Sequence, residues 1–188
     1  MNAKEKSKLV TSTLKIGSTA PDFNLPAVDG NNYSLYSFKD SVALVVIFSC
    51  NHCPYVQAYE DRIIELQKEY KDKGVVVVAI NANDSANYPD DSFDHMVNRA
   101  KQKGFNFPYL RDEEQIAASA YGATHTPEVF LFNKERKLVY TGKIDDNWQE
   151  PEKVRNQYLK NAIDELLKGK EISVPETYSI GCTIKWKD

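Results

Sequence analysis

Two cysteines separated by two residues, Cys50 and Cys53, have the types and spacing best suited to chemistry in this sequence. Thiolates are nucleophiles, and two thiols at this spacing can close a disulfide across one helical turn. The apolar run 42–48 ends just before the pair, and an amphipathic pattern begins just after it. Cys50 is therefore expected at a strand-to-helix turn, where unpaired helix N–H groups favour a thiolate.

The spacing predicts a cycle between a dithiol and a disulfide. Cys50 is the expected nucleophile, and Cys53, which should turn toward the core, is the expected resolving thiol. Cys50 attacks a substrate disulfide, a mixed disulfide forms, and Cys53 displaces the reduced product. His52, when protonated, should stabilise the thiolate further. The partners are a disulfide- or thiol-containing protein or small molecule and an electron-donor thiol system, and the cycle needs no cofactor.

Two other functions use the same residues. A thiol-dependent peroxidase would employ Cys50 or Cys53, with Cys182 or the neighbouring cysteine as resolving thiol. A metal-binding module would hold copper or zinc through Cys50, Cys53 and His125, since thiolates and imidazole suit both metals. Cys182, near the end of the sequence, is either a third redox cysteine or a small buried apolar residue.

The segments around the motif must place it at the edge of a sheet. Runs 42–48 and 75–80 are continuous and mostly β-branched, as in strands that are buried on both faces. Between them, apolar residues recur every three or four positions up to Gly74, so the three segments form a βαβ unit with parallel strands. Two further helices are expected after it, at 93–103 and 113–121.

The remaining segments predict antiparallel strands that extend the sheet of this βαβ unit. Runs 129–132 and 137–140 flank a polar tetrapeptide and predict a hairpin, and a helix should follow from Pro151 to 168. A small hairpin is expected at the front, around residues 29–32. The predicted fold class is α/β, with a mixed central sheet, helices on both faces and an N-terminal β-hairpin. The expected organisation is an N-terminal extension at 1–15, one domain at 16–168 and an irregular C-terminal tail at 169–188.

Charge and hydropathy limit the partners. The chain has 188 residues, a formal net charge of −3 and a pI near 5.7. A chain with this charge lacks the basic surface that binds phosphate backbones or anionic lipid. No apolar run in the sequence approaches the length of a membrane span. Residues 1–10 are polar, without the apolar run of a secretory signal. We therefore expect neither nucleic acid nor membrane as a partner, and a cytoplasmic location.

Several motifs give the sequence a family resemblance. They are Gly17-Ser-Thr-Ala-Pro-Asp-Phe23, Phe48-Ser-Cys-Asn-His-Cys-Pro-Tyr55, Tyr121-Gly-Ala123, Thr126-Pro-Glu-Val-Phe-Leu131 and Gly181-Cys-Thr-Ile-Lys-Trp186. With these motifs the chain resembles the thioredoxin-like superfamily, in the peroxiredoxin-like branch of alkyl hydroperoxide reductase and thiol-specific antioxidant (AhpC/TSA) proteins. The resemblance implies a thioredoxin-like fold, an antioxidant or disulfide-reductase activity, and a cis proline facing the cysteines.

The resemblance also implies which residues support the cysteines. They are His52, Pro54, Tyr55, Thr126 and Pro127, and Pro127 is the expected cis proline. The sequence departs from true peroxiredoxins, whose peroxidatic cysteine follows a Pro and a Thr that are absent before Cys50 and Cys53. It also departs from thioredoxins, which place a Trp where this chain has Ser49. These departures favour disulfide chemistry over direct peroxide reduction, and they leave the substrate open.

Overall fold

The computed structural model describes residues 14–188, and its centre is a five-stranded mixed sheet. The strand order is β5-β4-β3-β7-β8. β3 lies in the middle, parallel to β4 and antiparallel to β7. The strands are β3 (Ala43–Ser49), β4 (Val75–Asn81), β5 (Tyr109–Arg111), β7 (Glu128–Phe132) and β8 (Leu138–Gly142). Every residue of β3 is buried, which explains why its sequence is continuously apolar and does not alternate.

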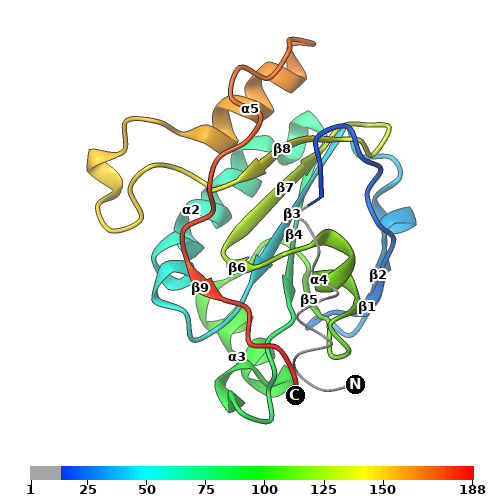
Figure 1. Cartoon of the computed structure of the whole chain (residues 1–188), viewed down its shortest axis with the longest axis vertical. Coiled ribbons are helices and arrows are strands. Elements are labelled where there is room, and N and C mark those ends of the chain that lie inside the picture. Colours follow the sequence, from blue (N-terminus) through cyan, green and yellow to red (C-terminus); the bar gives the residue numbers. More distant parts are fainter. Residues whose placement is uncertain (1–13) are drawn as a thin grey trace.

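Helices cover both faces of this sheet (Figure 1). One face packs against the apolar sides of α2 (Pro54–Tyr70), α3 (Phe93–Lys103) and α5 (Tyr158–Leu167). The other face packs against α4 (Ile116–Tyr121) and the segment of the hairpin formed by β1 (Asn24–Pro26) and β2 (Asn32–Ser34). Short 3₁₀ helices are η1 (Leu35–Phe38), η2 (Lys71–Lys73), η3 (Pro89–Asp91) and η4 (Pro151–Lys153).

The end of the chain returns to the sheet as a strap, which we define as residues 179–188. Within it, β9 (Cys182–Thr183) pairs antiparallel with β6 (His125–Thr126), the short strand just before β7. Figure 1 shows this red segment running past α2 to the end of the sheet where β6 lies. The strap therefore reaches the edge of the sheet at which β3 ends and α2 begins.

The predicted α/β class, the βαβ unit, both hairpins and the helices on both faces are confirmed. Two expectations are wrong. The last helix begins at Tyr158, because Pro151–Lys153 forms a separate 3₁₀ turn and the chain is irregular between them. The tail is not irregular throughout, because Cys182–Thr183 forms β9. Most of the predicted extension 1–15 lies outside the described residues, and the predicted domain boundaries stay a prediction.

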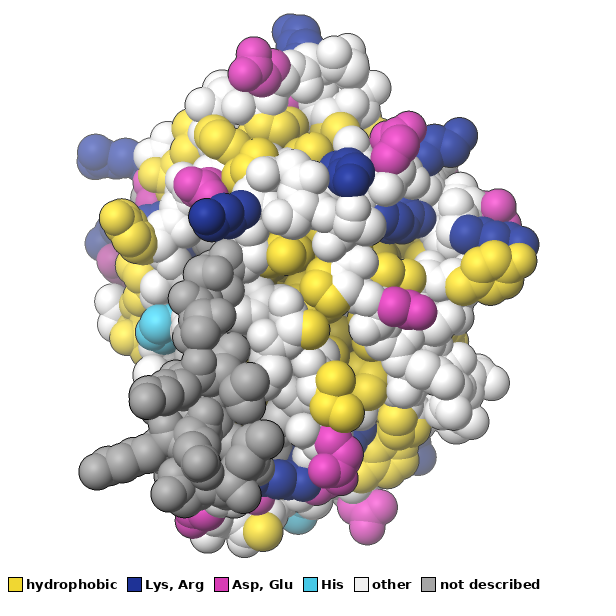
Figure 2. Space-filling model, turned by 45° about the vertical axis from the view of Figure 1, so that its right-hand side comes forward, with side chains coloured by type: hydrophobic (Ala, Val, Ile, Leu, Met, Phe, Trp, Pro, Cys, Tyr) yellow, Lys and Arg dark blue, Asp and Glu magenta, His cyan; other side chains and the backbone are white. Residues whose placement is uncertain are grey.

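The surface agrees with the small net charge. On the face drawn in Figure 2, lysine and arginine side chains lie among aspartate and glutamate side chains. None of the helices in residues 14–188 is both long and apolar enough to span a bilayer.

Candidate active site

Cys50 and Cys53 lie at the junction between β3 and α2. Cys50 directly follows the last residue of β3, and Cys53 is the N-cap residue of α2, which begins with Pro54. Pro54 suits this first helical position because its missing N–H would have no partner there. Both cysteine side chains are buried: Cys50 is 2% exposed and Cys53 is 0% exposed. The expected strand-to-helix turn is therefore present.

The loop before β7 faces both sulfur atoms. The Thr126–Pro127 peptide bond is cis, as the family resemblance implied. Cys50 Sγ lies 3.4 Å from Thr126 Oγ1, and Cys53 Sγ lies 3.4 Å from the Thr126 carbonyl oxygen. The structure thus brings together two parts of the sequence that are more than seventy residues apart. Cys50 and Cys53 come from the first part, and Thr126 and Pro127 come from the second.

The two thiols differ in how readily they ionise, in the opposite sense to the sequence expectation. A hydrogen bond from the Cys50 thiol to the Cys53 sulfur is the largest cause: it raises the pKa of Cys50 and lowers the pKa of Cys53. Burial and the Asp91 carboxylate raise the pKa of Cys50 further. Hydrogen bonds from the Cys182 thiol and the Val56 backbone N–H lower the pKa of Cys53 against its burial. These directions favour ionisation of Cys53 before ionisation of Cys50.

The position of the helix acts in the same direction. The sequence predicts Cys50 at the strand-to-helix turn, and in the structure the N-cap residue of α2 is Cys53. The backbone N–H of Val56, in the first turn, therefore contributes to the lowered pKa of Cys53.

Asp91 is a residue of the site that the sequence analysis missed. Its carboxylate is fully buried and accepts the backbone N–H of Asn51 at 2.6 Å, inside the C-x-x-C motif. Side-chain amides of Asn81 and Asn83 also donate to it, at 3.2 and 2.9 Å. No spacing in the sequence connects Asp91 to the motif, which lies forty residues earlier. The one hint is the polar run after β4, where parallel strands place their functional loops.

His52 is held by this carboxylate. Its Nδ1 lies 2.5 Å from Asp91 Oδ2, and its ring stacks on Tyr88 with centroids 5.5 Å apart. A carboxylate that contacts one imidazole nitrogen fixes the orientation of the ring. His52 and Asp91 are therefore in a position to carry a proton beside Cys50.

The remaining predicted side chains are placed differently. Tyr55 packs beside the cysteines, and its ring contacts the ring of Trp148 with centroids 4.3 Å apart. Tyr55 therefore forms part of the rim of the active site. Cys182 lies against the site from the strap, with its sulfur 2.8 Å from Cys53 Sγ.

The donor set expected for a metal is not assembled among the described residues. His125 Nδ1 instead contacts Thr124 Oγ1 at 2.8 Å. The group whose donor atoms do lie together, within 4.8 Å of one another, is Cys50, His52 and Asp91. Asp91 in this group is already fully engaged by the motif and its asparagine neighbours, so the arrangement resembles an internal hydrogen-bond network more than an open ligand set.

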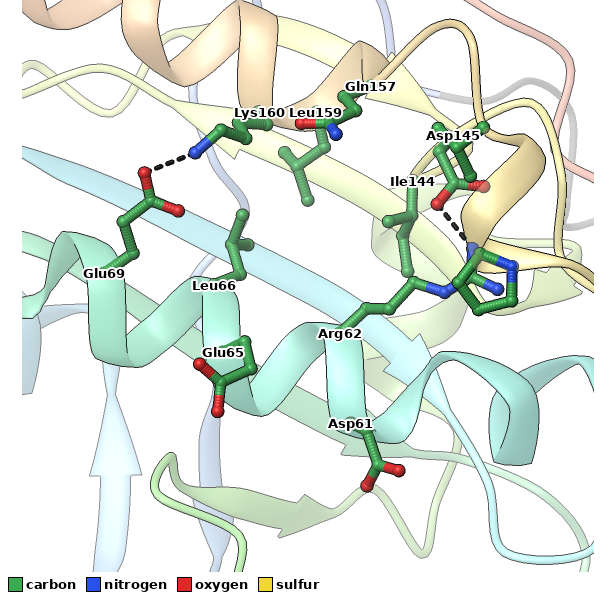
Figure 3. Close-up of a pocket in the computed structure, with 12 residues that line it drawn as sticks. Asp61, Arg62, Glu65, Leu66, Glu69, Ile144, Asp145, Gln157, Leu159 and Lys160 are labelled. Carbon is green, nitrogen blue, oxygen red and sulfur yellow. Dashed lines mark hydrogen bonds and ion pairs between the residues drawn. The ribbon is translucent and has the colours of Figure 1, made fainter.

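Two pockets show where substrates could approach. A polar groove of about 410 Å³ begins at Asn51 and His52 and runs along α3, where Asn98 and Gln102 line it. A second pocket, of about 530 Å³, lies between α2 and α5 (Figure 3). Its rim is charged: Arg62 pairs with Asp145 at 2.6 Å, and Lys160 pairs with Glu69. This second pocket has no cysteine or histidine in its lining, whereas the groove is lined by Asn51 and His52 of the C-x-x-C motif.

Comparison with known proteins agrees with this geometry. The family model described as Redoxin matches residues 15–158. The thiol-disulfide oxidoreductase ResA of Bacillus thuringiensis (strain Al Hakam) is 29% identical over 128 residues, which cover 67% of this chain and 68% of the relative.

Solved structures show the same fold. A hypothetical protein from Sinorhizobium meliloti 1021 is 40% identical, with a TM-score of 0.88 over 94% of this chain and 97% of that one. The thioredoxin domain of a thiol-disulfide oxidoreductase from Bacteroides vulgatus superposes with a TM-score of 0.60 at 19% identity, over 69% of this chain and 89% of that one. The latter likeness shows that the fold is thioredoxin-like.

Proposed function

The chain belongs to the Redoxin family and is a thiol-disulfide oxidoreductase, and we propose that its reaction is the cycling of Cys50 and Cys53 between a dithiol and a disulfide. The resemblance to the AhpC/TSA branch of the thioredoxin-like superfamily is thereby confirmed. The observation that carries the proposal is that both motif sulfurs lie 3.4 Å from Thr126, beside the cis Thr126–Pro127 bond.

We assign the first attack to Cys50, which directly follows β3, and the second to Cys53, the N-cap residue of α2. The proton of Cys50 moves along the hydrogen bond to Cys53 as the Cys50 sulfur attacks the substrate disulfide, and the first substrate thiolate leaves. Cys53 returns to the thiolate, which its lowered pKa favours, and the leaving thiolate takes up a proton. Cys53 then attacks the Cys50 sulfur of the mixed disulfide and releases the second substrate thiolate. The substrate has gained two electrons, and the protein holds a Cys50–Cys53 disulfide.

Other groups of the site support these steps. The Thr126 hydroxyl lies at hydrogen-bond distance from Cys50 and can donate to its thiolate as that charge forms. His52, oriented by Asp91, exchanges protons with solvent. An external thiol system reduces the Cys50–Cys53 disulfide again and completes the cycle.

The substrate is a disulfide-containing small molecule or protein segment of polar character. The groove beside His52 supports this, because amide and imidazole side chains line it on α3. An Asn98→Leu variant is expected to raise KM for a polar disulfide such as oxidised glutathione while kcat changes little. Equal KM values for the variant and the wild type would place the substrate elsewhere.

The proposal is tested by equilibration of the full chain with mixtures of reduced and oxidised glutathione. Alkylation of free thiols and peptide mass spectrometry then identify the disulfide. A reversible disulfide between Cys50 and Cys53 is expected, together with catalysis of insulin reduction that Cys50→Ser abolishes. Ser49→Ala, at the neighbouring position on β3, is the matched control and should keep the activity. The absence of any intramolecular disulfide at every glutathione ratio would contradict the proposal.

A thiol peroxidase with an antioxidant role is the second candidate, and the observation that favours it concerns Cys53. Its thiolate is favoured by the lowered pKa, and a further thiol, Cys182, lies beside it. A Cys53 thiolate would take one oxygen from a hydroperoxide and become a sulfenic acid, and a neighbouring thiol would condense with it, releasing water. Catalytic consumption of hydroperoxide that disappears in Cys53→Ser would support this function. Stoichiometric consumption alone would contradict it.

A further inference from the structure

The strap positions a third sulfur at the active site. In the register of β6 and β9, Cys182 is opposite Thr126, the residue that contacts both motif cysteines. Cys182 Sγ lies 2.8 Å from Cys53 Sγ. Cys53 thus has sulfur neighbours on two sides, namely Cys50 from its own motif and Cys182 from a segment 129 residues further along the chain.

Backbone contacts hold the strap in this place. An added Cβ at Gly181 would lie 2.1 Å from the carbonyl oxygen of Thr126, so only glycine permits the approach. The N–H of Ile184 donates to the Thr124 carbonyl at 2.9 Å, and the N–H of Lys185 donates to Asn83 Oδ1 at 2.9 Å. The Ile184 side chain is buried in the core. The position of Cys182 is therefore built by the fold on both sides of the residue.

The charges of the three sulfurs suit exchange among them. Burial and the contact with Cys53, whose sulfur lies 2.8 Å away, raise the pKa of Cys182, so Cys182 stays a thiol in the reduced protein. When Cys53 is oxidised, the negative charge that helps to raise the pKa of Cys182 is gone. Cys182 can then lose the proton and become a nucleophile beside an electrophilic sulfur.

We propose that Cys182 is a third redox thiol that takes over the active-site disulfide by exchange at Cys53. The step rests on the proposed function, which supplies the Cys50–Cys53 disulfide. The Cys182 thiolate attacks Cys53 Sγ, a Cys53–Cys182 bond forms, the Cys50–Cys53 bond breaks, and Cys50 leaves as a thiolate that takes up the proton of Cys182. No electrons are gained or lost overall.

Exchange changes which sulfur is available. After it, Cys50 is free to attack again, while the oxidising equivalent is stored between Cys53 and the strap. The new bond also ties the strap covalently to the β3–α2 junction. Cys53 is the central sulfur in this scheme, because it belongs to both disulfides.

The experiment uses full-length protein oxidised with excess oxidised glutathione, alkylated with N-ethylmaleimide and digested with trypsin. Cleavage after lysine and arginine leaves Cys50 and Cys53 on peptide 40–62 and Cys182 on peptide 171–185. A disulfide-linked pair of these two peptides is expected in wild type, with fragmentation placing the bond at Cys53. In Cys50→Ser this pair should hold all of the intramolecular disulfide, and in Cys53→Ser it should fall about tenfold.

A second variant tests the role of the strap without removing a sulfur. Gly181→Ala should lower the yield of the linked pair about tenfold, because the added methyl group displaces Cys182 from Cys53. Ser179→Ala, in the same strap, should leave the yield unchanged. A wild-type disulfide confined to peptide 40–62, with no linked pair in Cys50→Ser, would overturn the exchange and leave the proposed function intact. The absence of both disulfides would overturn both.

Discussion

At the scale of single residues, the central feature is that the pKa of Cys53 is lowered while the pKa of Cys50 is raised. Three groups surround the Cys53 thiolate: the thiols of Cys50 and Cys182 and the first turn of α2. These three groups stabilise the Cys53 thiolate. The thiolate becomes more reactive when one of the two neighbouring thiols moves away from it. The site therefore separates storage of the charge, at Cys53, from the first contact with substrate, at Cys50.

This separation predicts the pH dependence of ionisation in the reduced protein. The pKa of Cys53 is lowered, so its thiolate should form as pH rises at values below the ordinary thiol pKa of 9.0. Cys50 and Cys182, whose pKa values are raised, should ionise only above it. Ultraviolet absorbance of the thiolate during a pH titration measures both steps. Cys53→Ser should remove the lower step, and a lower step that persists in this variant would show that the charge lies elsewhere.

Asp91 gives a second prediction at this scale. Asp91→Asn weakens the hydrogen bonds that the carboxylate accepts from Asn51, Asn81 and Asn83. It also weakens the contact with His52. Loss of hydrogen bonds to a buried charge should lower the free energy of unfolding by about 2 kcal/mol and reduce disulfide-reductase activity. Asp90→Asn, at the exposed adjacent position, is the control in denaturant unfolding and activity assays. Equal stability of the two variants would refute the role of the network.

At the scale of elements, the connections that position the motif depend on two left-handed glycines. Gly74 leads from the end of α2 into β4 with φ of 80°, and Gly104 ends α3 with φ of 67°. Each conformation is costly for a residue with a Cβ. The two sites differ in their surroundings: a Cβ at Gly74 would meet Val42 Cγ2 at 2.7 Å, whereas a Cβ at Gly104 would meet no atom within 4 Å.

Alanine substitutions at these glycines should separate backbone strain from steric contact. Gly104→Ala should lower the free energy of unfolding by about 1 kcal/mol, from the left-handed conformation alone. Gly74→Ala should cost about 2 kcal/mol, because Val42 must also move and it is hydrogen bonded to Gly74. Urea unfolding with fluorescence detection measures both values. A larger loss for Gly104→Ala would contradict this interpretation.

The elements also show how far the sequence predicts the fold. Long strands and helices have repeating apolar positions, so β3, α2 and β4 were predicted close to their bounds. β5 was missed because three residues, Tyr109–Arg111, are too few to show a period. The pairing of β6 with β9 and the contact of Asp91 with Asn51 were missed for another reason. Both connect distant segments, and each depends on tertiary geometry that local sequence does not encode.

At the scale of the whole molecule, the strap closes the site. Ile184 is 4% exposed, and Trp186 packs against the core, so the strap is part of the folded body. The tail before it is more open, as shown by Tyr178, which is 94% exposed. We therefore expect the strap, through Cys182, to limit access to Cys53.

A chain ended at Tyr178 tests this control. Loss of the buried Ile184 and Trp186 surface should lower the free energy of unfolding by about 2–3 kcal/mol. Alkylation of Cys53 by N-ethylmaleimide in the reduced protein should accelerate on the order of tenfold, because its cover is removed. Tyr178→Ala in the full-length chain controls for the exposed residue. Unchanged alkylation of Cys53 in the shortened chain would show that the strap does not limit access.

The strap also sets an order of events during synthesis. Every strand of the central sheet precedes residue 143, and the ribosome makes Cys182 and its flanking residues only after them. Since domains fold as their residues emerge, the sheet and the motif can form while the strap is still absent. Until residues 182 and 183 have been made, β9 cannot pair with β6 and Cys182 cannot lie against Cys53. The contact that covers Cys53 is therefore added to a sheet that can already be folded.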